Sequence, residues 1–291
     1  MHRKQLGFLL MAVSAIGLAI ATIMMKVLPA EANMTPGQIA VWRFLIAAPL
    51  MWLILWIRKG EARVVPAQTP RLLLLGGIYS MASLLALTSL NRLPSSIYVI
   101  IVFFYPSLIV VYHLIRRQPV PRLWWLGLPL TLVGLVLTVS HFGQPVTLDA
   151  IGILLTILNG LAMAIYMLWS EKVFSGVSDR QLGSTWVMTG AMAVGLLLIF
   201  LFGFKTPDTV KGWAMLFTLG VVGTLIPIFA MNVGIQMLGS ARSSMISTLQ
   251  PVVTVLISMI FLQEVLSATQ WIGGIMVIFA ILLLQRSPDV H

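Results

Sequence analysis

The chain has 291 residues, of which 59% are hydrophobic and only 9% are charged. A soluble domain carries roughly 25% charged residues, so this composition excludes a water-soluble globular protein and indicates a surface that faces lipid. The absence of cysteine excludes disulfides, thiol chemistry and cysteine metal sites.

Ten apolar segments follow one another along the chain. We place them at 6–28, 37–57, 71–91, 95–115, 123–141, 150–170, 181–202, 213–236, 242–262 and 269–285. A helix of about 20 apolar residues is long enough to cross a bilayer. Helices are expected because lipid offers backbone groups no hydrogen-bonding partner, whereas a transmembrane barrel would show short alternating segments. The sequence therefore predicts an all-α integral membrane protein with ten transmembrane helices.

The chain has a net charge of +10, and its basic residues are distributed unequally between the two sides of the membrane. If the N-terminus is cytoplasmic and the ten segments alternate, four basic residues lie outside and Arg43 lies within a segment. The other 13 of the 18 lie inside: Arg3, Lys4, Arg58, Lys59, Arg63, Arg71, Arg116, Arg117, Arg122, Lys172, Arg180, Arg242 and Arg286. This asymmetry follows the positive-inside rule. It predicts a multi-pass protein of a bacterial inner membrane with both termini cytoplasmic, in contact with the lipid bilayer and not with nucleic acid.

The two halves of the sequence resemble each other. The runs FYPSLIVVYHLIRRQP (104–119) and LQPVVTVLISMIFLQE (249–264) place Pro106 and Pro251 145 positions apart, and the same offset sets Gly7 on Gly152. Residues 1–145 and 146–291 are thus predicted to be two five-helix repeats. Because five is odd, the second repeat enters the membrane from the opposite face. Such inverted repeats are typical of alternating-access transporters, whose substrate site lies near mid-membrane between the halves.

On these residues the chain resembles the drug/metabolite transporters of the EamA type. The resemblance covers nearly the whole length and rests on the pattern LxPxxxxLxxxxxxxE, carried here by Leu249, Pro251 and Glu264 and followed by QWIGGIMVIFAILLL. The first half departs from it, with Gln118 and Pro119 where the glutamate would have its counterpart. The resemblance implies ten helices in two five-helix halves and export of metabolites, especially amino acids; aromatic amino-acid exporters are members.

Polar stripes run along helices at matching positions of the two halves, and further polar and aromatic residues lie within other segments. Polar groups in lipid are costly, so these side chains are predicted to face the protein interior or a wet cavity. The alternative is hydrogen bonding between helices. The predicted substrate-binding residues are Arg43, Tyr79, Ser83, Tyr98, Tyr105, Asn159, Tyr166, Asn232, Ser247 and Gln250.

Arg43 is the one charge clearly inside a segment, and it suits bidentate pairing with a substrate carboxylate. The alternatives are snorkelling to the outer surface and an internal hydrogen-bond network. Pro106 and Pro251 lack an amide donor, so each is predicted to disturb its helix and to act as a hinge. A static kink that shapes packing is the alternative.

The sequence therefore predicts an exporter of small organic metabolites, with amino acids, including aromatic ones, as the leading substrates. No acidic residue lies near the middle of a segment and arginine does not titrate, which favours a facilitator or exchanger without obligatory proton coupling. The alternative is a multidrug exporter of amphipathic or cationic compounds. Scattered histidines and missing catalytic motifs disfavour an enzyme, and no filter-like motif indicates a channel. We expect a monomer that transports a small-molecule substrate, with no cofactor and no metal.

Overall fold

The structure, a computed structural model, has helices joined by loops and no strand in the residues that it describes, which are 2–58, 68–93, 95–117, 122–139, 149–262 and 267–285. The helices are α1 His2–Ala32, α2 Pro36–Ile57, α3 Thr69–Leu90, α4 Ser95–Val102, α5 Tyr105–Ile115, α6 Arg122–Val139, α7 Ala150–Ser175, α8 Arg180–Phe202, α9 Val210–Gly220, the π-helix η2 Val221–Leu225, α10 Ile226–Leu238, α11 Ser240–Ser247, α12 Leu249–Leu262 and α13 Ala268–Gln285. Gln118, Pro119 and Glu264, which belong to the repeated pattern, lie outside the described residues.

Seven helical segments of the described chain are long and apolar enough to cross a membrane, and the chain is a multi-pass membrane protein. They are α1, α2, α3, the α4–α5 pair, α7, α8 and the run from α9 through η2 to α10. α6 and α13 are shorter apolar helices, and the predicted segment 242–262 is divided between α11 and α12. Within the described residues, every predicted segment thus lies on helix, although three of them are interrupted.

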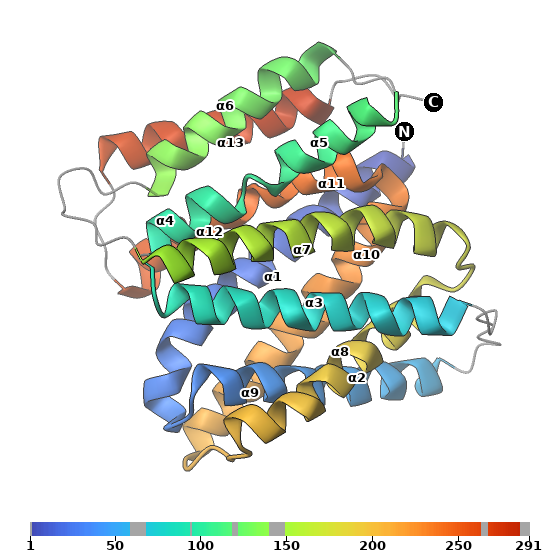
Figure 1. Cartoon of the computed structure of the whole chain (residues 1–291), viewed down its shortest axis with the longest axis vertical. Coiled ribbons are helices and arrows are strands. Elements are labelled where there is room, and N and C mark those ends of the chain that lie inside the picture. The colour runs from blue at the N-terminus through green and yellow to red at the C-terminus, as the bar shows by residue number, and fades with distance from the viewer. Residues whose placement is uncertain are drawn as a thin grey trace.

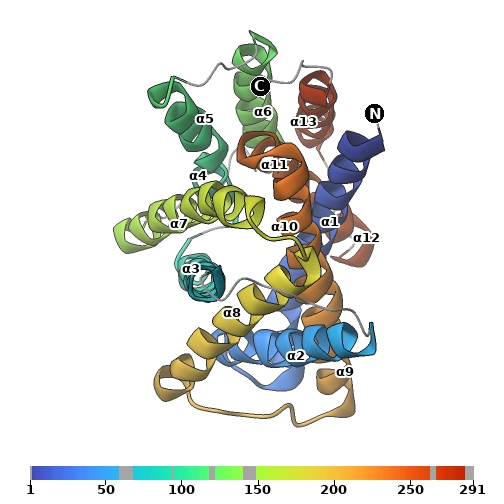
Figure 2. The same ribbon diagram turned by 90° about the vertical axis from the view of Figure 1, so that its right-hand side faces the viewer.

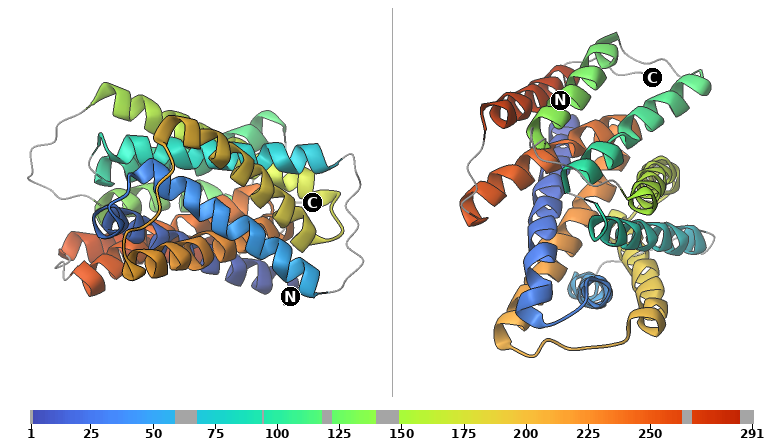
Figure 3. Two further views of the ribbon diagram at one scale, coloured as in Figure 1. Left: turned by 90° about the horizontal axis from the view of Figure 1, so that it is seen from below. Right: turned by 60° about the vertical axis from the view of Figure 1, so that its left-hand side comes forward.

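The helices lie side by side in one bundle (Figure 1). α6 pairs with α13 at one edge, and α2, α8 and α9 gather at the other (Figure 2). α1, α3, α7 and α10 fill the middle, where α1 packs against α10 and α3 packs against α7. In the view from below, α2 and α8 lie together on the near face (Figure 3). The predicted site residues lie on these middle and lower helices and on the broken ones beside them.

Two helices are broken at matching positions. α4 gives way to α5 just ahead of Pro106, and α11 gives way to α12 just ahead of Pro251. A proline has no amide to donate to the fourth carbonyl before it, which here belongs to Val102 and to Ser247, the last residues of α4 and α11. The predicted disturbance of both helices is confirmed. Their action as hinges stays a prediction.

A third irregularity, the π-helix η2, was not predicted. The amide of Ile226 donates to the carbonyl of Val221, and the hydroxyl of Thr224 donates to the carbonyl of Leu219, each five residues back. Pro227 follows directly and cannot supply an amide for a regular turn. Widened turns of this kind are frequent at functional sites. Here the turn directs Thr224 into the bundle, where it is fully buried.

Glycines bring helices of the two halves into backbone contact. A Cβ added at Gly76 of α3 would overlap the carbonyl oxygen of Val187 in α8, and one added at Gly190 would overlap the carbonyl oxygen of Leu73. Membrane helices have no hydrophobic drive to associate in lipid, so small residues that permit close approach stabilise their packing.

Packing contacts also repeat at the offset seen in the sequence. A Cβ added at Gly7 would lie 2.8 Å from Cγ of Leu238, and one added at Gly152 would lie 2.7 Å from Cγ of Leu93. Each residue of the first pair is 145 positions from its counterpart in the second. The start of α1 therefore meets the end of α10 in the same way that the start of α7 meets the residues that directly follow α3.

Candidate functional site

Arg43 projects from α2 into the bundle, where only 4% of its surface is exposed. Its Nε donates to the hydroxyl of Thr224 at 3.0 Å and its Nη1 to the hydroxyl of Ser83 at 3.2 Å. The Tyr79 side chain lies close to the guanidinium, and the guanidinium carbon lies 5.1 Å from the centre of the Phe44 ring, a cation–π distance. Snorkelling to the surface is excluded by this burial. The internal hydrogen-bond network considered as an alternative is present.

Tyr79 of α3 and Tyr166 of α7 form the aromatic centre beside the guanidinium. Their ring centroids are 5.2 Å apart with the planes tilted by 56°. The Tyr166 hydroxyl donates to Oδ1 of Asn232 at 2.5 Å, and Nδ2 of Asn232 donates to the hydroxyl of Ser184 at 3.4 Å. The side chains of Tyr166, Asn232 and Ser184 are fully buried. A path of polar and aromatic contacts thus runs from Arg43 to α8.

Two further tyrosines on the broken helix α4–α5 reach the second half. The Tyr98 hydroxyl donates to Oδ1 of Asn159 at 3.3 Å, and Nδ2 of Asn159 donates to the carbonyl of Ala82. The side chains of Tyr105 and Ser247 face each other at close range. Tyr105, Asn159 and Ser247 are buried, and Tyr98 is half-buried.

These contacts form three groups, which meet in one hydrophobic core because Tyr79, Tyr105 and Tyr166 belong to it and Tyr98 packs against it. Together the groups contain nine of the ten predicted substrate-binding residues. We define the interior cluster as Arg43, Tyr79, Ser83, Tyr98, Tyr105, Asn159, Tyr166, Ser184, Thr224, Asn232 and Ser247. Gln250, the second residue of α12, is half-buried and is not hydrogen-bonded to the cluster within the described chain. Thr224 and Ser184 were missed by the sequence reasoning. The only signal for Thr224 was Pro227, a proline inside an apolar run.

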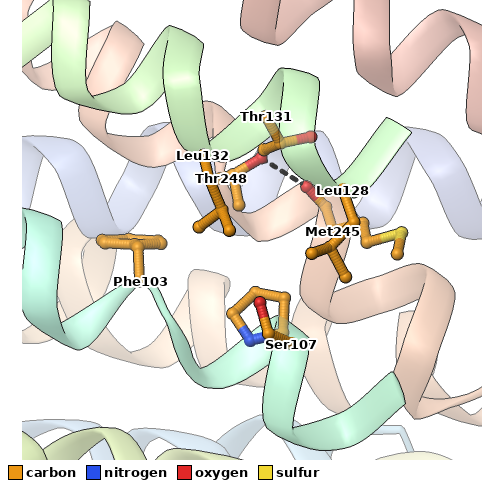
Figure 4. Close-up of a pocket in the computed structure, with 8 residues that line it drawn as sticks. Phe103, Ser107, Leu128, Thr131, Leu132, Met245 and Thr248 are labelled. Atoms are coloured by element: carbon orange, nitrogen blue, oxygen red, sulfur yellow. Dashed lines mark hydrogen bonds between the residues drawn. The ribbon is translucent and has the colours of Figure 1, made fainter. Parts of the chain in front are cut away.

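A small cavity of about the size of one water molecule lies between the two helix breaks (Figure 4). Its lining comes from the breaks and α6: Phe103, Pro106, Ser107, Leu128, Thr131, Leu132, Met245 and Thr248. The hydroxyls of Thr131 and Thr248 donate to carbonyls of their own helices, each at 2.6 Å. The buried hydroxyl of Ser107 finds no hydrogen-bonding partner among the described residues. The cavity is too small and too apolar for a substrate, and it leaves space beside both breaks.

Charged side chains are found at the two ends of α7. Near its C-terminus, Glu171 accepts from the backbone amide of Ser240 at 3.0 Å and from the Ser240 hydroxyl, and Nε2 of His113 lies 3.2 Å from that hydroxyl. At its N-terminus, Asp149 pairs with Arg92 at 2.9 Å. This pairing holds the pKa of the Asp149 carboxyl below its usual value. The interior cluster between these ends has a single charge, that of Arg43.

A solved crystal structure of another protein shares this fold. It aligns with a TM-score of 0.80 over 97% of this chain and 96% of that one. The two sequences are 15% identical, so the likeness concerns the fold alone.

Sequence relatives are transporters by name. An uncharacterised transporter of Archaeoglobus fulgidus is 27% identical over 64% of this chain and 66% of its own length. The uncharacterised inner membrane transporter YicL of Salmonella typhimurium is 27% identical over 63% of this chain and 61% of its own. The uncharacterised transporter YwfM of Bacillus subtilis is 22% identical over 89% and 87%. The matches to the first two relatives span less than two thirds of their lengths.

The family is decided by a profile that matches the chain twice. The profile of the EamA-like transporter family matches residues 5–140 and again residues 150–286, so the two matches together cover nearly the whole sequence. They agree with the membrane-length helices and with the transporter names of the relatives. The chain belongs to the EamA-like transporter family.

Proposed function

We propose that this protein is an alternating-access exporter of small organic metabolites, with amino acids, including aromatic ones, as its main substrates. One observation carries the proposal: four contacts of the interior cluster each join a residue of the first half to a residue of the second. The pairs are Arg43 with Thr224, Tyr79 with Tyr166, Tyr98 with Asn159, and Tyr105 with Ser247. A site shared between two halves opens to one side or the other as the halves rock against each other.

The chemistry of the cluster favours a substrate with a carboxylate and a ring. The Arg43 guanidinium can take a carboxylate in a bidentate pair, and such pairs are among the stronger hydrogen-bonded contacts in proteins. The rings of Tyr79 and Tyr166 supply apolar faces with a polar hydroxyl at one edge, which suits stacking on an aromatic side chain. A cationic compound would place a second positive charge beside Arg43. The multidrug alternative is therefore weaker for cations than for neutral amphipathic compounds.

The proposed architecture is ten membrane spans in an inverted repeat of residues 1–145 and 146–291. The contacts that recur at an offset of 145 positions support it. So does the direction of the first helix of each half: α1 runs from the right-hand side of Figure 1 towards the left, and α7 runs from left to right. Two halves of this kind supply two equivalent gates at opposite ends of one site.

We place the protein in the bacterial inner membrane with both termini cytoplasmic. α1 begins and α13 ends on the same side of the bundle (Figure 1). Basic residues gather on that side, among them Arg58, Arg116 and Lys172. Basic residues are enriched in cytoplasmic loops of membrane proteins, which supports this orientation.

Pro106 and Pro251 are proposed hinges. Each stands directly after a break, and the cavity of Figure 4 lies between the two breaks. The cavity marks incomplete packing beside both breaks, where a tilt of the two parts of each helix would be opposed least. The single charge of the interior cluster belongs to Arg43, which supplies no proton, and this supports transport without obligatory proton coupling.

Counterflow in proteoliposomes tests the proposal. Vesicles are loaded with unlabelled phenylalanine, leucine, threonine or an amphipathic cation, and labelled phenylalanine is added outside without a pH gradient. We expect transient accumulation of label after amino-acid loading, and its loss in the Arg43→Gln variant. Arg71→Gln, at an exposed arginine in the first turn of α3, is the matched control and should leave accumulation unchanged. Accumulation after loading with the cation alone would favour the multidrug function, and none under any loading would refute phenylalanine transport.

A further inference from the structure

The guanidinium of Arg43 is surrounded by neutral groups. Its hydrogen bonds go to the hydroxyls of Thr224 and Ser83 and to the sulfur of Met25 at 3.6 Å, and the neutral phenol of Tyr79 lies close by. A charge taken out of water is costly, and neutral hydroxyls compensate it only in part. The cluster therefore has one uncompensated positive charge, which an anion would neutralise.

No residue of the cluster can supply a matching negative charge for a substrate's ammonium group. The acidic residues of the chain all lie near or beyond the ends of the apolar segments: Glu31, Glu61, Asp149, Glu171, Asp179, Asp208, Glu264 and Asp289. The neutral acceptors deepest in the cluster are already engaged, because Oδ1 of Asn232 accepts from Tyr166 and Oδ1 of Asn159 accepts from Tyr98. An ammonium group bound here would lose its water and gain no ion pair.

We propose that the site recognises aromatic monocarboxylates through the carboxylate and the ring alone, and that the α-ammonium group of an amino acid contributes nothing to binding. The inference rests on the proposed function and specifies its substrate class. The carboxylate pairs with Arg43, between Thr224 of the second half and Ser83 of the first, and the ring lies against Tyr79 and Tyr166. An arylalkanoic acid such as 3-phenylpropanoate satisfies both contacts without carrying a buried ammonium group.

Ligand-induced thermal stabilisation of the purified protein in detergent tests the inference with three probes of similar size. Phenylalanine has the ring, the carboxylate and the ammonium group; 3-phenylpropanoate lacks the ammonium group; 2-phenylethylamine lacks the carboxylate. We expect 3-phenylpropanoate to stabilise the protein at concentrations no higher than those needed for phenylalanine. We expect 2-phenylethylamine to need concentrations higher by about tenfold or more, the factor that loss of one hydrogen-bonded charge contact gives.

Substitutions of Arg43 test whether the ligand-induced stabilisation depends on its guanidinium. Arg43→Gln should abolish stabilisation by both carboxylates, and Arg43→Lys, which keeps the charge without the planar fork, should weaken it by about tenfold. Arg71→Gln should change neither. If Arg43→Gln does not fold, Arg43→Lys and the wild-type comparison of probes still decide the matter.

The outcomes separate this inference from the proposed function. Stabilisation by phenylalanine but not by 3-phenylpropanoate would overturn the inference and leave amino-acid export standing. Stabilisation by 2-phenylethylamine as strong as that by 3-phenylpropanoate would also overturn it. If none of the three probes stabilises the protein, the inference and the aromatic part of the proposed function both fail. Stabilisation by 3-phenylpropanoate with no counterflow of phenylalanine would support the inference and redirect the substrate to carboxylates that lack an ammonium group.

Discussion

Two neighbouring glycines of α3 offer a matched test of how closely the halves pack. At Gly76 an added Cβ would overlap the carbonyl oxygen of Val187 in α8. At Gly77 the same Cβ would meet Cγ2 of Val194 at 3.4 Å, an ordinary contact. We predict that Gly76→Ala separates α3 from α8 and destabilises the protein, whereas Gly77→Ala does not.

The magnitude follows from what the two substitutions share. Each replaces glycine by alanine inside a helix and gains about 0.8–1 kcal/mol of helix propensity, so this gain cancels in the comparison. What remains is the overpacking at Gly76. Its nearest obstacles are backbone atoms of Val187 and Ala191, which cannot turn aside as a side chain can. Overpacking of this kind costs about 1–3 kcal/mol, and that is the expected difference in free energy of unfolding between the variants.

Unfolding in mixed micelles with a rising fraction of dodecyl sulfate, followed by tryptophan fluorescence, measures this difference. Gly76→Ala should unfold at a lower fraction of dodecyl sulfate than the wild type, and Gly77→Ala at the same or a higher fraction. Equal midpoints for the two variants would show that α3 and α8 do not touch at Gly76, and the reasoning would be refuted. Counterflow by the folded Gly76→Ala protein would show whether transport also depends on this contact.

Three further predictions concern polar contacts. Thr224→Ala removes the acceptor of the Arg43 Nε and should lower the free energy of unfolding by about 1–3 kcal/mol. Thr224→Ser keeps the hydroxyl and should retain most of the wild-type stability. Equal losses for the two variants in the dodecyl sulfate assay would contradict this. Glu171→Gln removes a negative charge from the N-terminus of α11 and should cost about 1 kcal/mol, a loss that added salt reduces; a cost independent of salt would argue against the charge. The ion pair with Arg92 lowers the pKa of Asp149 in the folded protein, so its contribution is present above the ordinary value of 3.8 and is lost as the pH falls through the lowered value. The thermal midpoint of Arg92→Gln should therefore lie below that of the wild type at neutral pH and match it in strong acid, and a gap that persists in acid would exclude the ion pair as the cause.

Local chemistry explains what the sequence could predict about the fold. Lipid forces each spanning segment to satisfy its own backbone hydrogen bonds, so an apolar run of sufficient length is enough to predict a helix. A disturbance at Pro106 and Pro251 was predictable because a missing amide acts on its own helix. The missing amide alone does not decide a break, since α1, α2 and α6 continue through Pro29, Pro49 and Pro129. The π-helix η2 was not predictable, since it involves contact with a distant segment: a Cβ added at Gly17 of α1 would lie 2.7 Å from the carbonyl oxygen of Val222.

The candidate site was predictable as a set of residue types and not as a set of contacts. Whether a long side chain such as Arg43 reaches the surface depends on its neighbours from other helices, so the sequence left three environments open. Thr224 escaped notice because hydroxyl side chains in apolar helices commonly bond a carbonyl of their own helix, as this one does to Leu219. Only the fold shows that its oxygen also accepts from Arg43. The role of Gln250 stays a prediction.

The two repeats share corresponding positions along their helices but differ in where they carry a buried charge. Trp42 and Trp186 correspond across the repeat, and the residue after each is Arg43 in the first half and Val187 in the second. Val187 is buried, and its carbonyl oxygen is the atom that faces Gly76, so the second half uses this position for helix packing. Two identical repeats related by a two-fold axis would allow a substrate to bind in two equivalent orientations. A guanidinium present on one half alone makes them unequal, because a carboxylate gains its pair in one orientation only. In the proposed mechanism, the movement of the halves depends on the features that both halves share, and the orientation of the bound substrate depends on Arg43, which only the first half has.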